Sequence, residues 1–201
     1  ASSASRSPEA GWDSFVVPDS LCYPEVSDSS YPYTPDGRRE FLEDKPFLDP
    51  FSLIPAMGAV TRSLRFTTFV VKLPIRHPVL VAKSACSVAV LTQNRFGFGM
   101  GLSPWPEDFA VTGTDWATRG ARMDEMIEII RGLSSGDYFA YRGAHYTIPS
   151  IKQTPAPTRP IPFLIGGHAE PALRSGARLG GGWMHAGSDA ETLTRLLGRL
   201  R

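Results

Sequence analysis

The stretch LRFTTFVVKLPIRHPVLVAKSACSVAVLTQNRFGFGMG, residues 64–101, decides the fold class. Its first ten residues, Leu64–Leu73, are rich in β-branched and aromatic side chains and predict a strand. Pro78 suits the first position of a helix, and residues 79–91 are apolar nearly all round, which predicts a helix packed on a sheet. Residues 95–101 predict the next strand. A strand, a helical crossover and a second strand are the unit of a parallel sheet.

The same alternation continues on both sides of this unit. Strands are predicted at 14–17 (expected to be buried), 64–73, 95–101, 162–165 and 183–186, and a hairpin at 139–148. Helices are predicted at 51–60, 79–91 and 119–133, near Pro171, and at the end of the chain. The last helix is expected to follow a capping box formed by Ser188 and Glu191. Short apolar strands with helical crossovers predict a parallel sheet covered on both faces. An open doubly wound sheet and a (β/α) barrel both satisfy this pattern.

Composition excludes several classes of protein. The 201 residues suffice for about one domain, and 42% hydrophobic with 20% charged residues permits a packed core. A net charge of +1 provides no basic field for nucleic acid, and no apolar run is long enough to span a membrane. Two cysteines (Cys22 and Cys86) and four scattered histidines form neither a disulfide framework nor a metal site. We therefore expect a cytoplasmic protein without metal, nucleic-acid or membrane ligands.

Chemistry in either type of sheet lies at the carboxyl ends of the strands. At one such end, Gly166-Gly167-His168 joins a predicted strand to a predicted helix. These residues either cradle a phosphate with backbone N–H groups or form a tight turn.

Three further features can be interpreted either as part of a ligand site or as ordinary structural features. The long segment 21–50, and within it YPYTPDG at 31–37, forms either a lid over a flat ligand or a pair of proline-driven turns. Trp105 either walls a pocket or packs in the core. Arg119 and Arg122 are expected to be salt-bridged or solvated.

Taken together, the strand ends resemble those of the luciferase-like monooxygenase superfamily, and within it the coenzyme F420-dependent oxidoreductases of actinobacterial type. The motifs that carry the resemblance are AGWDSFVVPD (10–19), YPYTPDG (31–37), LDP (48–50), LPIRHPV (73–79), NRF (94–96) with GMG (99–101), RGAR (119–122), PFLIGG (162–167) and ARL (177–179) with GW (182–183). They run in collinear order over about residues 9–200. The resemblance implies a TIM-type (β/α) barrel of the bacterial luciferase type that binds a flavin-like ring in its mouth.

The resemblance also implies particular site residues. A non-proline cis peptide is expected at Phe69-Val70, behind the ring. The other residues implied near the cofactor are Gly101, Leu102 and Ser103 at the ring, Gly166, Gly167 and His168 at its phosphate, and Gly182 and Trp183 beside them. Relatives often have Asp-His where this chain has Asp19-Ser20, and an acidic residue where it has Pro104. Asp19 is therefore the only candidate catalytic residue, and no general base is predicted.

Only strands equivalent to the second through sixth of eight are found, and the chain begins at Ala1 without Met. We expect residues 1–201 to be a single partial barrel domain, either a fragment, a naturally short protein or one that closes through a partner. The expected function is hydride transfer between coenzyme F420 and a small organic substrate. The alternatives are an FMN-dependent monooxygenase that uses reduced flavin and O2, and a barrel without turnover. The expected partners are the small-molecule substrate and a second copy of the chain.

Overall fold

The computed structural model describes residues 11–31, 34, 36–179, 181–185, 187 and 189–199. Its strands are β1 Ser14–Val17, β2 Arg65–Thr68, β3 Val71–Lys72, β4 Phe96–Gly101, β5 Phe139–Arg142, β6 Thr147–Ile151, β7 Phe163–Gly166 and β8 Gly182–Met184. Its helices are α2 Pro50–Ala59, α3 Pro78–Leu91, α4 Pro106–Thr112, α5 Arg119–Leu133, α6 Glu170–Leu179 and α7 Ala190–Arg199, with short 3-10 turns η1 Glu40–Leu42 and η2 Leu73–Ile75.

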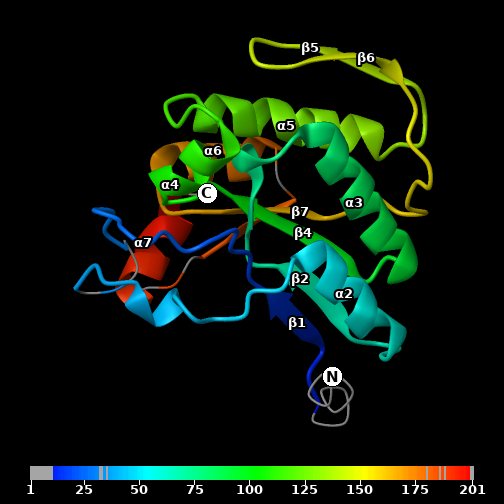
Figure 1. Cartoon of the computed structure of the whole chain (residues 1–201). Coiled ribbons are helices and arrows are strands. Elements are labelled where there is room, and N and C mark those ends of the chain that lie inside the picture. Colours follow the sequence, from blue (N-terminus) through cyan, green and yellow to red (C-terminus); the bar gives the residue numbers. More distant parts are fainter. Residues whose placement is uncertain are drawn as a thin grey trace.

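The main sheet is parallel and follows the order β1-β2-β4-β7-β8, with β3 paired to β4 (Figure 1). The spatial order of the strands equals their order along the chain, so successive crossovers move in one direction. A doubly wound sheet reverses direction at a switch point, whereas a (β/α) barrel does not. The predicted barrel winding is therefore confirmed. Within the described residues β1 and β8 do not pair with each other, so the sheet is an open section of a barrel.

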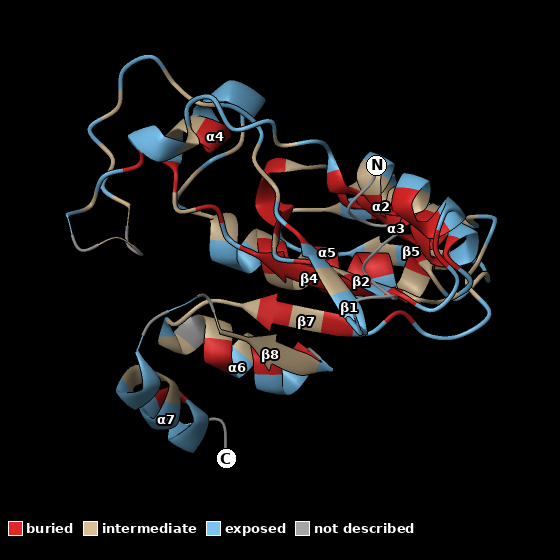
Figure 2. Cartoon of the chain, turned by 90° about the horizontal axis from the view of Figure 1, so that it is seen from below, coloured by how far each residue is buried: buried red, intermediate tan, exposed pale blue. Residues whose placement is uncertain are grey.

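The helices form a layer against this sheet. Neighbouring helices pack in chain order, α2 on α3, α3 on α5 and α5 on α6 (Figure 1). The core that they enclose with the strands includes Phe66, Phe98, Ile127 and Leu133, each fully buried. Figure 2 shows buried residues along β4 and on the helices beside it, whereas α7 is largely exposed. Burial of these apolar side chains is the main source of stability for the sheet and its helices.

Helix starts follow local signals in the sequence. Pro78 occupies the first position of α3, as predicted, and His77 Nδ1 accepts a hydrogen bond from the Val79 N–H at 3.3 Å. Asp49 caps α2 by accepting from the Ser52 N–H at 2.9 Å. The bounds predicted for α5 are those observed.

The structure corrects several predicted elements. The run 64–73 is not one strand: it divides into β2, a cis peptide at Phe69-Val70, β3 and η2. In β1 only Val17 is buried, because within the described residues this strand has a single strand neighbour, β2. Helix α4 was not predicted.

The predicted capping box can be checked only in part. Ser188 lies outside the described residues. The start of α7 carries a different contact, in which Asp189 Oδ1 accepts from the Thr192 N–H at 2.7 Å. Asp189 therefore provides the described N-terminal hydrogen bond of this helix.

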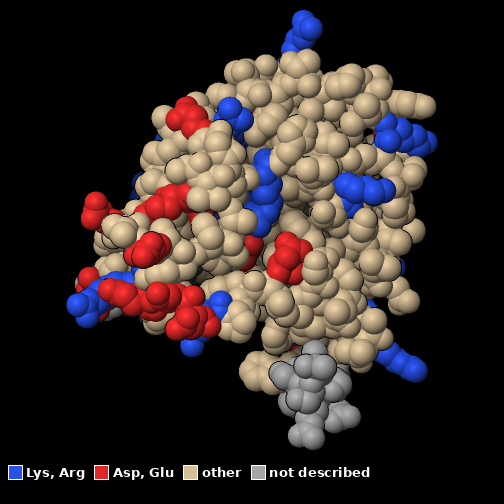
Figure 3. All heavy atoms as spheres, viewed as in Figure 1, with Lys and Arg blue, Asp and Glu red and all other residues tan. Residues whose placement is uncertain are grey.

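Charged side chains are unevenly distributed over the surface. On the face shown in Figure 3, acidic and basic side chains gather at the lower left, where the segment before α2 and helix α7 lie, whereas the rest of the face carries scattered charges. No helix in the described part of the chain has the length and apolar character needed to cross a membrane.

Gly99 in β4 offers a test of this packing. An added Cβ would overlap the Thr68 carbonyl oxygen and lie 2.7 Å from Met184 Sδ, and backbone of the neighbouring strand cannot move aside cheaply. We expect Gly99→Ala to lower the free energy of unfolding by about 3 kcal/mol or more, as for severe overpacking. Urea denaturation followed by circular dichroism measures it.

Gly120 provides the matched control for this substitution. It lies in helix α5, and apart from its own helix backbone and chain neighbours no atom of the described residues comes within 4 Å of a Cβ built on it. We expect Gly120→Ala to raise the free energy of unfolding by about 0.5–1 kcal/mol, the usual gain for this exchange in a helix. Equal unfolding free energies for the two variants would contradict the packing described for β4.

Candidate functional site

A cavity of about 600 Å³ opens at the carboxyl ends of β3, β4 and β7. This volume lies in the range of small-molecule and cofactor sites. The cavity is lined by Pro18, Asp19, Ser20, Tyr31, Leu42, Phe47, Phe69, Val70, Lys72, Gly101, Leu102, Ser103, Pro104, Trp105, Trp116, Arg119, Gly166, Gly167, His168, Ala169, Ala172 and Met184. Strand ends and the segment 21–48 therefore enclose one space.

Most of the predicted cofactor residues lie together in this lining. They are Phe69, Val70, Gly101, Leu102, Ser103, Gly166, Gly167 and His168, and the catalytic candidate Asp19 lies there too. Gly182 and Trp183 do not line the cavity. Trp183 lies just behind it, where its Nε1–H donates to the Gly167 carbonyl at 2.7 Å. Trp183 thus fixes the turn after β7 from outside.

Val70 forms the floor of the cavity. Its peptide bond with Phe69 is cis, as the resemblance implied. A Cβ on Gly101 would lie 2.9 Å from Val70 Cγ2, and one on Gly166 would lie 2.8 Å from Val70 Cγ1. Glycine at these two positions is therefore required by the Val70 side chain, which fills the notch between β4 and β7.

The turn between β7 and α6 requires a glycine for another reason. Gly167 has φ +130°, a conformation that side chains disfavour, and a Cβ there would lie 3.0 Å from the Ala172 Cβ. The geometry establishes a tight turn that also lines the cavity. It leaves the predicted phosphate cradle as a prediction.

His168 follows this turn and stacks on His185, with ring centroids 4.7 Å apart. Burial, and then the charges of His185 and Arg195, lower the pKa of His168 below its ordinary value of 6.5. The lowered pKa favours the neutral form of His168.

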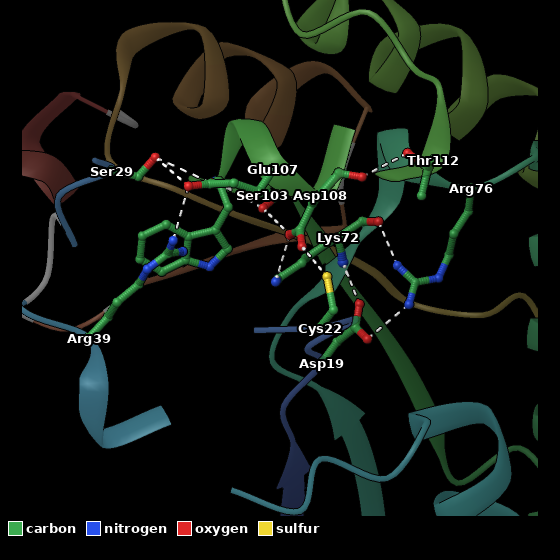
Figure 4. Close-up of polar contacts among 11 residues, drawn as sticks. Asp19, Cys22, Ser29, Arg39, Lys72, Arg76, Ser103, Glu107, Asp108 and Thr112 are labelled. Carbon is green, nitrogen blue, oxygen red and sulfur yellow. Dashed lines mark hydrogen bonds and ion pairs between the residues drawn. The ribbon is translucent and has the colours of Figure 1, made fainter. Parts of the chain in front are cut away.

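Asp19 has both carboxylate oxygens occupied, as Figure 4 shows. Its Oδ1 lies 2.9 Å from Arg76 Nη2, and its Oδ2 accepts from the Lys72 backbone N–H at 2.9 Å. Arg76 Nη1 in turn donates to the Lys72 carbonyl at 2.8 Å. With its side chain only 2% exposed, Asp19 joins the end of β1 to β3. Its predicted catalytic role remains a prediction.

A second buried network lies beside it and was not predicted. Lys72 Nζ lies 2.7 Å from Asp108 Oδ2, and the same oxygen accepts from Ser103 Oγ at 2.5 Å (Figure 4). The Lys72 and Asp108 side chains are 8% and 2% exposed. The sequence did carry a signal, since Lys72 is a charged residue within an otherwise apolar stretch.

The segment 21–48 is attached to the start of α4. Glu107 accepts a hydrogen bond from Ser27 Oγ. It also accepts from Ser29 Oγ at 3.0 Å and pairs with Arg39 Nη2 at 3.1 Å, as Figure 4 shows. Burial by itself would raise the pKa of Glu107, but its hydrogen bonds and Arg39 together lower it below the ordinary value.

Aromatic contacts complete this attachment. The Arg39 guanidinium lies 3.9 Å from the centroid of a Trp105 ring, and the Tyr31 ring stacks on Trp105 at 5.2 Å. Tyr31, Leu42 and Phe47 of the segment line the cavity, and hydrogen bonds typical of turns also join Tyr31 to Gly37 and Gly37 to Thr34, so both the lid and the turns remain predictions. Residues 32, 33 and 35 of the motif at 31–37 lie outside the described residues. Trp105 walls the cavity and is also packed.

Arg119 lies on the cavity wall beside Trp116. Its guanidinium lies 3.8 Å from the centroid of the Trp116 ring, and its Nη1 donates to the Trp116 carbonyl at 2.8 Å. In the part of the chain that the structure describes, no carboxylate pairs with Arg119 or Arg122, so of the two expected settings, salt-bridged or solvated, the salt bridge is not found. Arg122 instead donates to Thr118 Oγ1, at 3.0 Å. Arg119 is thus a cation on the cavity wall with donors available for an anion.

Comparison with known sequences agrees with this geometry. The sequence profile of luciferase-like monooxygenases matches residues 4–201. An uncharacterized protein of Mycobacterium tuberculosis (strain ATCC 25618 / H37Rv) is 58% identical over 192 residues, which cover 96% of this chain and 66% of that protein. The F420-dependent hydroxymycolic acid dehydrogenase of the same organism is 28% identical over 143 residues, covering 70% of this chain and 40% of that protein. This chain thus spans at most about two thirds of these relatives.

Solved structures show the same fold. An F420-dependent secondary alcohol dehydrogenase in complex with an F420-acetone adduct superposes with a TM-score of 0.71 at 16% identity, over 98% of this chain and 58% of that one. The oxygenating constituent of 3,6-diketocamphane monooxygenase from the CAM plasmid of Pseudomonas putida, in complex with FMN, gives a TM-score of 0.71 at 17% identity, over 99% and 55%. The predicted luciferase-like barrel class is therefore confirmed.

The attachment of the segment 21–48 through Glu107 predicts a dependence on pH. Because the pKa of Glu107 is lower in the attached state, the stabilisation is complete above the ordinary carboxyl pKa of about 4.3 and is lost as the pH falls from there through the lowered pKa. Hydrogen exchange of peptides from 21–48, corrected for intrinsic rates, should therefore be slow at pH 7 and accelerate below about pH 4.3.

Glu107→Gln should remove this pH dependence, because a neutral side chain cannot pair with Arg39. Its segment should exchange at least about fivefold faster at pH 7, the loss expected for a charge-assisted contact of about 1 kcal/mol or more. Glu43→Gln is the matched control: Glu43 lies on the same segment, is exposed and has no side-chain ion pair within the described residues. Equal exchange in the two variants would contradict the anchoring role of Glu107.

Proposed function

Because this chain belongs to the luciferase-like monooxygenase family, we propose that its cavity binds coenzyme F420 and serves hydride transfer between that cofactor and a small organic substrate. The observation that carries the proposal is the cavity itself, in which an apolar floor and a cation without a carboxylate partner among the described residues line the same space. Similarity to the F420-dependent hydroxymycolic acid dehydrogenase supports the choice of cofactor.

The lining residues suit such a cofactor. Phe69 and Val70 offer a flat apolar surface for a tricyclic ring, and a volume of about 600 Å³ admits a ring with part of its tail. Arg119 supplies a fork of N–H donors for the phosphate. Helices α5 and α6 pack on each other, and Ser175 Oγ of α6 donates to Asp124 Oδ1 of α5 at 2.9 Å. Arg119 and Gly167 line the same cavity, and the cofactor phosphate is predicted at the Gly167 turn.

When bound, the cofactor supplies the carbon that accepts or gives up the hydride. The chain's own residues bind, orient and shield. Val70 and Phe69 would support one face of the ring, Trp105 would limit its sideways movement, and Tyr31 on the segment 21–48 would exclude water from above. Asp19 holds β3, and with it Lys72, in place beneath the site.

The second candidate is an FMN-dependent monooxygenase. The fold that this chain shares with the FMN-bound oxygenating constituent of 3,6-diketocamphane monooxygenase supports it, because the two rings have the same outline. A barrel that binds a ligand without turnover is the third, supported by Ser20 and Pro104 at positions where relatives carry reacting side chains.

Titration of the purified chain with oxidised F420 and with FMN separates these candidates. We expect saturable binding of F420, at least about tenfold tighter than that of FMN, followed by the fluorescence of each cofactor. Tighter binding of FMN would favour the monooxygenase. Failure to bind either would contradict the proposed function and support the third candidate.

The role proposed for Arg119 is tested with F420 and with its deazariboflavin portion, which lacks the phosphate. Arg119→Gln should weaken F420 binding about tenfold or more, since a charge-assisted hydrogen bond contributes about 1.5–3 kcal/mol, and should leave the deazariboflavin Kd within about twofold. Arg122→Gln is the control, because Arg122 does not line the cavity. Equal losses for both ligands would show that Arg119 does not bind the phosphate.

A further inference from the structure

Lys72 is a buried cation that uses only part of its hydrogen-bonding capacity. Its ammonium group has three N–H donors. Within the described residues one polar partner, Asp108 Oδ2 at 2.7 Å, accepts from it. The side chain is 8% exposed and Lys72 lines the cavity, so a bound molecule is the remaining source of acceptors once water is displaced. Unsatisfied donors of a buried charge are costly, which makes the pair a site prepared for an oxygen atom.

The charge on Lys72 is balanced before any ligand arrives. Asp108 neutralises it, and Asp108 Oδ2 also accepts from Ser103 Oγ, which in turn accepts from the Trp105 N–H at 3.1 Å. These bonds fix the carboxylate and so the direction of the ammonium group. A pair with no net charge suits a ligand atom that is uncharged when it binds and gains negative charge during the reaction. Such a pair does not repel the uncharged atom, and it does not bind the negatively charged atom too tightly.

The position of Lys72 selects which ligand atom that is. Lys72 pairs with Gly101 across β3 and β4, and it is two residues after Val70, the floor of the cavity. Both neighbours belong to the set predicted to surround the cofactor ring. Lys72 therefore lies at the strand ends predicted to surround the ring, and its partner Asp108 also accepts from Cys22 Sγ of the segment 21–48 at 3.9 Å.

We propose that the ammonium group of Lys72 donates a hydrogen bond to the pyrimidine edge of the bound ring and stabilises the negative charge that this edge gains when the ring accepts a hydride. The hydride brings two electrons and one proton to the ring carbon, and the displaced electron pair moves to the ring nitrogen and carbonyl oxygen of the pyrimidine. Lys72 forms and breaks no covalent bond and remains protonated. This inference rests on the proposed function.

The test compares the affinities of the chain for oxidised and reduced F420, measured anaerobically by fluorescence and absorbance titration. Lys72→Met alone would leave Asp108 buried without a partner and could prevent folding. The double variant K72M/D108N removes both charges and keeps an acceptor for Ser103. We expect the ratio of reduced to oxidised affinity to fall about tenfold or more relative to wild type, the value of a hydrogen bond to a charged group.

Two single variants complete the design. Lys72→Arg keeps a cation at this position and should hold the ratio within about threefold of wild type. Lys152→Met removes a lysine beyond β6, outside the cavity lining, and should leave the ratio unchanged. A purely structural role of Lys72 would weaken both redox forms equally and leave the ratio intact.

The possible failures are distinguishable. If wild type binds F420 in both forms and K72M/D108N keeps the wild-type ratio within about threefold, the inference is overturned and the proposed function stands. If wild type binds neither form, the proposed function is wrong and the inference falls with it. The ratio of reduced to oxidised affinity could also fall about tenfold in Lys72→Arg, as in the double variant. A positive charge at this position would then be insufficient, and the electrostatic role stated above would be overturned.

Discussion

The bridge that Asp19 makes from the end of β1 to the backbone of β3 positions the rest of the site. Two oxygens of one buried carboxylate hold the Lys72 N–H and the Arg76 guanidinium, and Arg76 returns to the Lys72 carbonyl. A two-residue strand cannot fix its own direction by pairing alone. Because a buried carboxylate must satisfy its hydrogen bonds, the bridge determines where β3 lies and where the Lys72 side chain projects.

Polar contacts connect β3 to α4 in the wall of the cavity, and α4 to the segment 21–48 that covers it. Lys72 holds Asp108 on α4, and the next residue back along the chain, Glu107, holds the segment 21–48 through Arg39 and two serines. One short helix thus connects the floor to the cover. Glu107 and Asp108 face different partners because successive residues on a helix project about 100° apart. Loss of either ion pair would therefore also alter the position of the residues at the other end of the cavity.

Much of this arrangement follows from the sequence, for reasons that can be stated. Residues 119–133 and 78–91 carry strong helical periodicity or a proline at the start, so α5 and α3 were predicted nearly to the residue. The run 64–73 reads as one strand because β-branched and aromatic residues continue through it, yet the cis peptide at Phe69-Val70 breaks it. No local pattern reports a backbone turn that depends on tertiary contacts.

Long-range polar contacts escaped prediction for the same reason. The partner of Lys72 is 36 positions away on a helix of seven residues that lacks periodicity, and the partners of Glu107 are about 70–80 positions away. Spacing along the chain carries no record of such contacts. Of the glycines predicted near the cofactor, Gly101, Gly166 and Gly167 line the cavity and Gly182 does not. Gly101 and Gly166 also make room for the Val70 side chain, which the sequence did not indicate.

The charges then decide what the cavity can hold. Lys72 and Asp19 are each paired with an opposite charge, and the lowered pKa of His168 favours its neutral form, whereas Arg119 has no carboxylate partner among the described residues. A ligand with an apolar ring and an anionic group near Arg119 complements that distribution, whereas a cation does not.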